Sequence, residues 1–237
     1  MNETIKKIYT DIADEYEKDR NVLGVALFGS VARGLNDEYS DIDIYVVMKN
    51  KSDISRKSYV VDGVRVEVLI DSFVDIMQYL ETEQYSLYRN VSQMFTFANV
   101  IYENSNILSE IIEFAKKNIK QRTKYTKAEI LMNKYSIDDF YSDMGRSYRY
   151  NDVISFELNS GLIIKNLIEL FLKIKGGYLK QPNEMSDYIY GLDSEFGDML
   201  NRYYLLIDLN DRYEFMSEII AYIYIHSHGS LPEKWEV

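Results

Sequence analysis

The sequence predicts an α+β fold, in which a small sheet with flanking helices is followed by an all-helical bundle. Runs rich in β-branched residues end near residue 70, and the apolar residues after that point recur at helical spacing. A run of strands followed by a run of helices is typical of α+β chains. Asparagines accumulate between residues 95 and 106, so we place a boundary there and expect one domain over residues 1–100 and a second over 101–237.

The first domain is expected to begin with a helix and to continue with four strands. Residues 3–18 carry apolar side chains at spacings of three and four, which predicts an amphipathic helix that packs on the sheet. Asp62 and Gly63 separate two β-rich runs and predict a hairpin. Ser72 is a suitable N-cap for the helix that follows the last strand. The predicted strands span about residues 23–28, 41–48, 56–61 and 64–70.

The second domain is expected to be helical throughout, because no further β-rich run follows Ser72. The strongest apolar face combines Leu158 and Leu162 with Ile163 and residues 167–171. The predicted helices span about residues 105–120, 124–150, 152–175, 184–206 and 211–228.

Three carboxylates of the predicted sheet form a candidate metal site. Asp41 and Asp43 are two residues apart in an extended strand, so their side chains share one face while Ile42 and Ile44 take the other. In the second strand of the hairpin, valines alternate with Glu67, which therefore points away from the apolar layer. Oxygen ligands without nearby sulfur or imidazole favour magnesium or manganese over zinc. We expect these three carboxylates to bind two cations together.

A turn of small residues precedes the carboxylates and forms a candidate polyphosphate site. Gly29 and Ser30 follow the apolar run 22–28, where a strand ends and a short helix can begin with free backbone N–H groups. Arg33 lies one helical turn further, and its guanidinium suits phosphate oxygens. Taken singly, each feature has a structural explanation, such as an ordinary turn, a solvated strand edge or a surface arginine. Together they predict a site for a metal-bound polyphosphate.

The order of these residues resembles the nucleotidyltransferase superfamily related to polymerase beta. The resemblance rests on Gly29-Ser30, Asp41-x-Asp43 and Glu67, and it covers roughly residues 20–71. The stretches Gly-Ser-Val-Ala-Arg-Gly and Ser-Asp-Ile-Asp are similar both to minimal nucleotidyltransferases and to the bacterial enzymes that adenylylate aminoglycoside or lincosamide antibiotics. The resemblance implies a small mixed nucleotidyltransferase sheet, ATP as the nucleotide donor and two magnesium ions.

The resemblance also implies a role for each matching residue in this chain. The triad of acidic residues is expected to bind the magnesium ions and to be catalytic, and the small-residue turn with its neighbours is expected to bind the nucleotide. The expected metal ligands are Asp41, Asp43 and Glu67, and the expected nucleotide-binding residues are Gly29, Ser30, Arg33 and Ser40.

By the same resemblance, residues 1–100 are the catalytic domain and residues 101–237 the acceptor-binding domain. Asp139, Asp143 and Arg146 fall on one face of a predicted helix. This segment is similar to a helix of kanamycin nucleotidyltransferases that carries a glutamate base and a phosphate-binding lysine. We expect Asp143 to act as the catalytic base, and a solvated helix face is the alternative. Antibiotic enzymes of this type pair two subunits, so a homodimer is a further expectation.

Charge and composition narrow the expected partners. The 38 acidic residues outnumber the 27 basic ones and give a net charge of −11, which disfavours nucleic acid because its binding depends on lysine and arginine. An acidic protein instead attracts a cationic small molecule. The absence of cysteine excludes disulfides and thiolate metal sites. Because no stretch of the sequence resembles a signal peptide or a membrane span, we expect a soluble cytoplasmic protein.

These observations predict a magnesium-dependent transferase that moves AMP from ATP to a hydroxyl of a small molecule. An aminoglycoside-like or lincosamide-like antibiotic is the expected acceptor, and antibiotic resistance the expected role. The alternative is an antitoxin-type nucleotidyltransferase that binds or adenylylates a partner protein, although the minimal proteins of that group resemble the first domain alone. A nucleotide-binding module without activity is a third interpretation, which the three intact carboxylates disfavour.

Overall fold

A five-stranded sheet lies at the centre of the first half of the chain in this computed structural model, which describes residues 3–236. Its strands are β1 (Val22–Phe28), β2 (Ile42–Met48), β3 (Arg56–Val61), β4 (Val64–Ser72) and β5 (Asn99–Glu103). They follow the order β3-β4-β2-β1-β5 across the sheet. β2 and β4 are parallel and the other neighbouring pairs are antiparallel, so the sheet is mixed, as the resemblance implies.

Asp62 and Gly63 form the turn between β3 and β4, and both have positive φ angles, of 51° and 82°. Two-residue turns of this kind match the right-handed twist of paired strands. The pairing runs outward from the turn and sets Ser58 opposite Glu67. The predicted hairpin is confirmed, and its turn fixes which residues of β3 lie beside Glu67.

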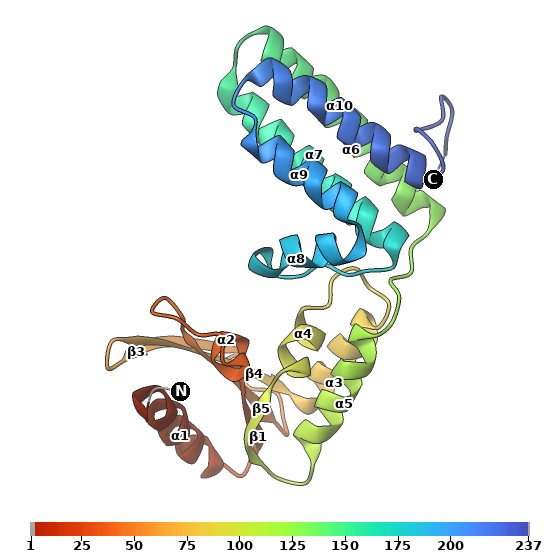
Figure 1. Cartoon of the computed structure of the whole chain (residues 1–237). Coiled ribbons are helices and arrows are strands. Elements are labelled where there is room, and N and C mark those ends of the chain that lie inside the picture. The colour runs from red at the N-terminus through yellow and green to blue at the C-terminus, as the bar shows by residue number, and fades with distance from the viewer. Residues whose placement is uncertain (1–2, 237) are drawn as a thin grey trace. The chain divides into compact units, whose positions relative to one another are not determined.

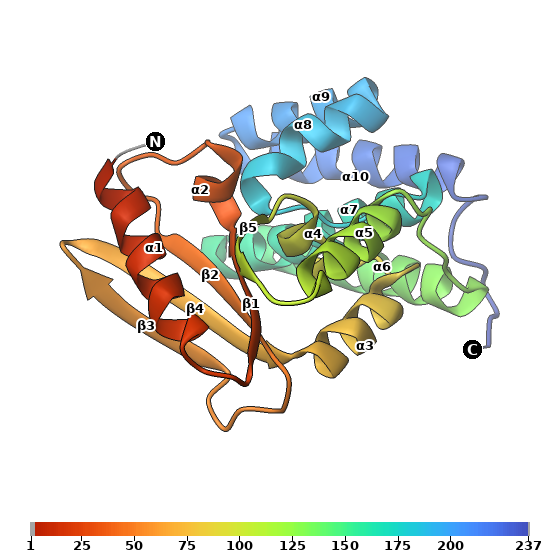
Figure 2. The ribbon, with the colours of Figure 1, turned by 90° about the horizontal axis from the view of Figure 1, so that it is seen from below.

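Helices cover both faces of the sheet, and each face has its own apolar core (Figure 2). One face carries α1 (Glu3–Glu17), and the other carries α3 (Phe73–Glu83), α4 (Asn90–Thr96) and α5 (Ile107–Ile119). Ile42 and Ile44 of β2 belong to the core under α1, whereas Tyr45 and Val47 belong to the core under the other three helices. Both cores arise because successive side chains of a strand point to opposite faces.

The sequence did not predict β5. Because β5 belongs to the sheet, the sheet unit ends later in the chain than expected. It pairs antiparallel with β1 at the edge of the sheet, and α5 then buries Leu108, Ile111 and Ala115 against the same sheet. The strand has only five residues, none of them fully buried, so its sequence lacks a clear alternation. The chain therefore divides after Gln121, whereas the sequence analysis placed the boundary at residues 95–106.

Arg89 explains why the sheet unit ends where α5 ends. Its side chain is fully buried, and its guanidinium donates hydrogen bonds to the backbone carbonyls of Ser86, Asn118 and Gln121 at 2.7, 2.7 and 2.8 Å. The last two acceptors lie at the end of α5 and just after it, where backbone carbonyls lack the N–H donors that a further helical turn would supply. A single buried arginine thus fastens the C-terminal end of α5 to the segment before α4.

The second unit of the chain begins at Arg122 and is helical, as predicted (Figure 1). Helices expected at 124–150, 152–175 and 211–228 are present with slightly different ends. The single helix expected at 184–206 is two helices. The observed helices are α6 (Lys127–Arg149), α7 (Val153–Lys175), α8 (Pro182–Leu192), α9 (Ser194–Leu205) and α10 (Leu209–His226).

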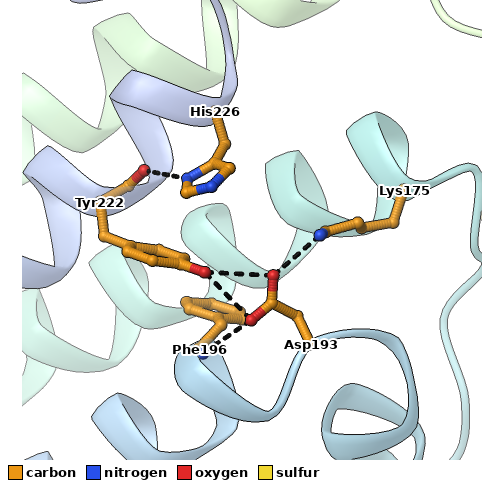
Figure 3. A network of polar contacts seen from close by, with 5 residues as sticks. All are labelled: Lys175, Asp193, Phe196, Tyr222 and His226. Atoms are coloured by element: carbon orange, nitrogen blue, oxygen red, sulfur yellow. Dashed lines mark hydrogen bonds and ion pairs between the residues drawn. The ribbon is translucent and has the colours of Figure 1, made fainter.

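Asp193 separates α8 from α9 and holds three helices together (Figure 3). Its backbone is extended, with φ −166° and ψ 104°, and its carboxylate accepts the backbone N–H of Phe196 at 3.1 Å. The same carboxylate pairs with Lys175 at the end of α7, at 2.8 Å, and accepts the hydroxyl of Tyr222 of α10. A helix through Asp193 would lose these contacts, which explains the break.

The apolar face of α7 differs from the predicted one at two residues. Ile163 and Leu167 are fully buried, but Leu158 is 65% exposed and Leu162 is 40% exposed. Leu158 and Leu162 are four residues apart and share a side of the helix that lies away from its buried side. The prediction was wrong for these two leucines, because the sequence pattern does not reveal which side the neighbouring helices cover.

Within residues 3–236, the helices are all too short or too polar to cross a membrane.

Candidate active site

A glycine turn at the end of β1 contacts the neighbouring strand directly. Gly29 begins the short helix α2 (Gly29–Arg33) and has a φ of +71°, a backbone conformation that favours glycine. Antiparallel pairing places Phe28 opposite Asp43 of β2. A Cβ atom on Gly29 would lie 2.0 Å from Oδ2 of Asp43, closer than any two such atoms can approach. The absence of a side chain at Gly29 therefore leaves the room that the Asp43 carboxylate occupies.

The three predicted metal ligands lie together. Asp43 and Glu67 are paired neighbours on the parallel strands β2 and β4, so their side chains leave the sheet on the same side. Asp41 precedes β2 by one residue and is two residues from Asp43. One carboxylate oxygen of each residue lies within 4.8 Å of the oxygens of the other two. The expected convergence of these side chains is confirmed, while their role as metal ligands stays a prediction.

The electrostatics of this triad of Asp41, Asp43 and Glu67 favour a bound cation. Burial and, to a smaller extent, the negative charges of Asp41 and Glu67 together raise the pKa of Asp43 to about 7, against an opposing effect of Arg56. Without a cation, Asp43 therefore keeps its proton to a higher pH than an ordinary aspartate does. An all-oxygen donor set of this kind suits magnesium or manganese. The residues present thus fit a divalent metal.

Arg56 is a residue of this site that the sequence analysis did not identify. It is the first residue of β3, and its guanidinium forms an ion pair with the carboxylate of Glu67. The side chain of Arg56 is 60% exposed and that of Glu67 is 21% exposed. Because Ser58 lies opposite Glu67, Arg56 stands diagonally across from it on the same face. The hairpin register, which the turn sequence predicts, contained the signal that could have found this contact.

The predicted nucleotide-binding residues lie on the short helix α2 and in the segment before β2. Ser30 and Arg33 belong to α2, and Arg33 Nε donates to the carbonyl of Gly29 at 3.3 Å. Ser40 lies in the segment before β2, where its hydroxyl donates to the carboxylate of Asp37 and accepts the backbone N–H of the same residue, both at 2.9 Å. These hydrogen bonds of Ser40 stabilise the loop that leads to Asp41. A contact of Ser40 with the nucleotide remains a prediction.

Asp143, the predicted catalytic base, belongs to the second unit. It lies on α6 and forms an ion pair with Arg146, three residues further along the helix. Its side chain is 37% exposed, and Asp139 on the same helix is exposed. The predicted helix face is present, and a role for Asp143 in proton transfer remains a prediction.

The second unit also contains a cavity of its own, with a volume of about 560 Å³. It lies among α7, α8, α9 and the segment before α8, and its walls are mostly apolar. Gly161 faces it, and a Cβ atom there would meet no atom within 4 Å. A cavity of this size can hold a drug-sized molecule. The apolar lining residues are Ile164, Ile168, Leu179, Pro182, Met185, Ile189 and Leu200.

Comparisons with known proteins gave a match to a family model and a similar crystal structure. Residues 5–134 match a family model described as a nucleotidyltransferase domain. A crystal structure of a nucleotidyltransferase-like protein from Exiguobacterium sibiricum 255-15 is similar, with a TM-score of 0.53 and 13% sequence identity. The similarity covers 92% of this chain and 74% of that chain, and at such low identity it concerns the fold alone. A search of the curated proteins gave no match.

Proposed function

The chain belongs to the nucleotidyltransferase domain family, and from this premise we propose that it transfers AMP from ATP to a hydroxyl of a small molecule. The observation that carries the proposal is the convergence of three carboxylates from neighbouring strands, with oxygens within 4.8 Å, beside a glycine turn. This arrangement puts metal ligands next to a loop that a polyphosphate can approach closely. The activity of the family and the geometry of the triad thus support the same reaction.

Two magnesium ions are proposed as cofactors, held by Asp41, Asp43 and Glu67. A pair of divalent cations supplies charge neutralisation for a polyphosphate and lowers the pKa of a bound hydroxyl. The raised pKa of Asp43 supports this assignment, because a carboxylate with that much unfavourable charge around it gains from a cation. We also propose that the protein is soluble and located in the cytoplasm.

The nucleotide is proposed to bind on the turn after β1. Gly29 has no side chain to keep phosphate oxygens away from the backbone N–H groups, and Arg33 carries a guanidinium on the same short helix. Ser30 adds a hydroxyl between them, and Ser40 is proposed to contribute from the loop before β2. These residues would hold the triphosphate while the triad faces the α-phosphorus.

In the proposed reaction, the oxygen of the acceptor hydroxyl attacks the α-phosphorus of ATP. A new oxygen–phosphorus bond forms, the bond to the β-phosphate oxygen breaks, and pyrophosphate leaves with its electron pair. The hydroxyl proton passes to a carboxylate base, for which Asp143 is the proposed residue. Asp143 forms an ion pair with Arg146 on the same helix.

The proposed acceptor is a cationic small molecule such as an aminoglycoside-like or lincosamide-like antibiotic. The net charge of −11 supports a cation over a nucleic acid. The cavity of about 560 Å³ in the helical unit supports a small molecule with an apolar part. A homodimer is proposed on the resemblance to antibiotic enzymes.

The test is an assay with ATP labelled on its α-phosphate, magnesium, and panels of aminoglycosides, lincosamides and candidate partner proteins. Label on a small molecule supports the proposal, whereas label on a protein supports the antitoxin-type alternative. Asp43→Asn should abolish transfer without loss of the fold, because Asp43 adds little to either apolar core. Asp62→Asn is the matched control, since it removes one carboxylate from the hairpin turn and keeps a residue that such turns favour. Transfer of label by the Asp43→Asn variant at the rate of the unmodified protein would overturn the proposal.

A further inference from the structure

We propose that Arg56 is a positioning residue. Its guanidinium pairs with the Glu67 carboxylate when no metal is bound and moves to phosphate oxygens when the nucleotide binds. The inference rests on the proposed function and adds a regulation of the same site. It makes Arg56 an internal competitor of the metal, so that metal binding is weak without nucleotide and strong with it.

The ion pair itself is the first observation. The guanidinium of Arg56 contacts Oε2 of Glu67, and an oxygen of Glu67 is one of the three that converge with Asp41 and Asp43. A carboxylate oxygen that accepts a hydrogen of a guanidinium has fewer lone pairs left for a cation. The positive charge of Arg56 also repels a divalent cation placed among the three carboxylates. Both effects lower the affinity of the triad for metal.

The second observation is that the Arg56 side chain can move away from Glu67. It is the first residue of β3, an edge strand of the sheet whose residues 56–60 are all exposed. The Arg56 side chain is 60% exposed, so its movement breaks no apolar contact of the core, whereas Glu67 is 21% exposed and stays in place. An ion pair with one exposed partner is weak, because water screens it. A bound triphosphate, with several negative charges and bidentate oxygens, can draw the guanidinium away.

Arg56 therefore has different partners in the two states that we propose. Without nucleotide, it balances part of the negative charge of the triad and keeps the Glu67 side chain in position. With nucleotide, it stabilises the charge on the phosphates and releases Glu67 to the metal. The exchange makes metal and nucleotide binding mutually favourable, since each removes an obstacle to the other.

The test measures Mn²⁺ binding to the full-length protein in the absence of nucleotide, by titration calorimetry. Arg56→Gln should bind Mn²⁺ about three to ten times more tightly than the unmodified protein, because the competitor is gone. Lys57→Gln is the matched control, since it removes one positive charge from the next residue of β3, whose side chain lies beside Tyr16 of α1. Its Mn²⁺ affinity should be unchanged. Equal or weaker Mn²⁺ binding by Arg56→Gln would overturn the inference and leave the proposed function standing.

Two further measurements separate charge competition from a structural role of Arg56. Arg56→Lys keeps the charge and should bind Mn²⁺ within about twofold of the unmodified protein. A gain equal to that of Arg56→Gln would overturn the inference. In the transferase assay, Arg56→Gln should raise the KM for ATP and lower the Mn²⁺ concentration needed for half-maximal rate, which a loss of packing does not do. If Arg56→Gln binds no Mn²⁺ without nucleotide, this inference is overturned, whereas the proposed function fails if no label is transferred from ATP.

Discussion

Gly29 and Asp43 lie so close that any Cβ atom on Gly29 would stand 2.0 Å from the carboxylate oxygen Oδ2 of Asp43. The contact joins the turn proposed to bind phosphates to the strand that carries Asp43 and directly follows Asp41, two of the proposed metal ligands. The two parts of the site therefore depend on each other, and a methyl group is enough to separate them.

Gly29→Ala should lower the transfer rate about a hundredfold, because the added methyl group displaces the Asp43 carboxylate from the other two. Gly34→Ala is the matched control, since Gly34 has nearly the same φ, +69°, and a Cβ atom there would meet no atom within 4 Å. Both variants should lose about 1 kcal/mol of unfolding free energy from the left-handed backbone. Steady-state rates and urea unfolding measure the two effects. Equal rates for the two variants would show that the Gly29–Asp43 contact has no part in transfer.

The stability of the metal-free protein should depend on pH through Asp43. The folded pKa of about 7 lies above the ordinary aspartate value of 3.8, so the folded state binds the proton more tightly than the unfolded state. The resulting stability is complete below pH 4 and is lost as pH rises through 7. The loss should be about 1–2 kcal/mol after allowance for the partial exposure of Asp43. Urea unfolding in EDTA at pH 5 and pH 8 measures it.

Asp43→Asn provides the control for this pH dependence. The variant has no charge to bury, so it should be more stable than the unmodified protein at pH 8 without metal. Addition of Mg²⁺ should stabilise the unmodified protein and leave the variant unchanged. Identical pH dependence of the two proteins would contradict the assigned pKa of Asp43.

Asp193→Ala should destabilise the helical unit by about 3 kcal/mol, because it leaves the partly buried ammonium of Lys175 without its partner and removes the cap of α9. Tyr222→Phe removes only the hydroxyl contact and should cost about 1 kcal/mol. Trp235, the single tryptophan, belongs to this unit and packs on Tyr135, so its fluorescence reports unfolding there.

Asp152→Ala is the comparison for the Asp193 variant. Asp152 caps α7 through the backbone N–H of Ser155 at 3.1 Å, in an exposed position, and its loss should cost about 1 kcal/mol. If Asp193→Ala costs no more than Asp152→Ala, Asp193 is an ordinary cap and does not join α7, α9 and α10.

Arg89→Met should destabilise the sheet unit by about 3–5 kcal/mol, since the backbone carbonyls of Ser86, Asn118 and Gln121 lose a fully buried donor. Calorimetry should show a lower unfolding temperature for one transition, while the unfolding monitored by Trp235 changes little. Arg20→Met, a change at an exposed arginine of the same unit, should stay within about 0.5 kcal/mol. Comparable losses in the two variants would contradict the fastening role of Arg89.

The parts of the site that could be predicted are those set by local rules. Alternation along a strand placed Asp41 and Asp43 on one face, and the alternating valines placed Glu67 away from the apolar layer. The Asp62-Gly63 turn fixed the hairpin register, from which the contact of Arg56 with Glu67 could also have been derived. These inferences need only neighbours along the chain or across one turn.

The parts that could not be predicted depend on neighbours distant in sequence. β5 is recognisable only once β1 offers it an edge, because its five residues have no buried alternation. The helical pattern continues through Asp193, and the break there follows from Lys175 and Tyr222, which no local pattern brings near. The exposure of Leu158 depends in the same way on which side of α7 its neighbours cover.

All of the side chains in the triad, the turn that contacts it and the arginine that pairs with it come from residues 29–67, inside the unit that Arg89 closes at Gln121. The side chains proposed to bind metal and nucleotide are consequently encoded in one continuous stretch of the gene. We expect mutations in the helical half to alter the proposed acceptor preference while the proposed metal and phosphate contacts are inherited intact.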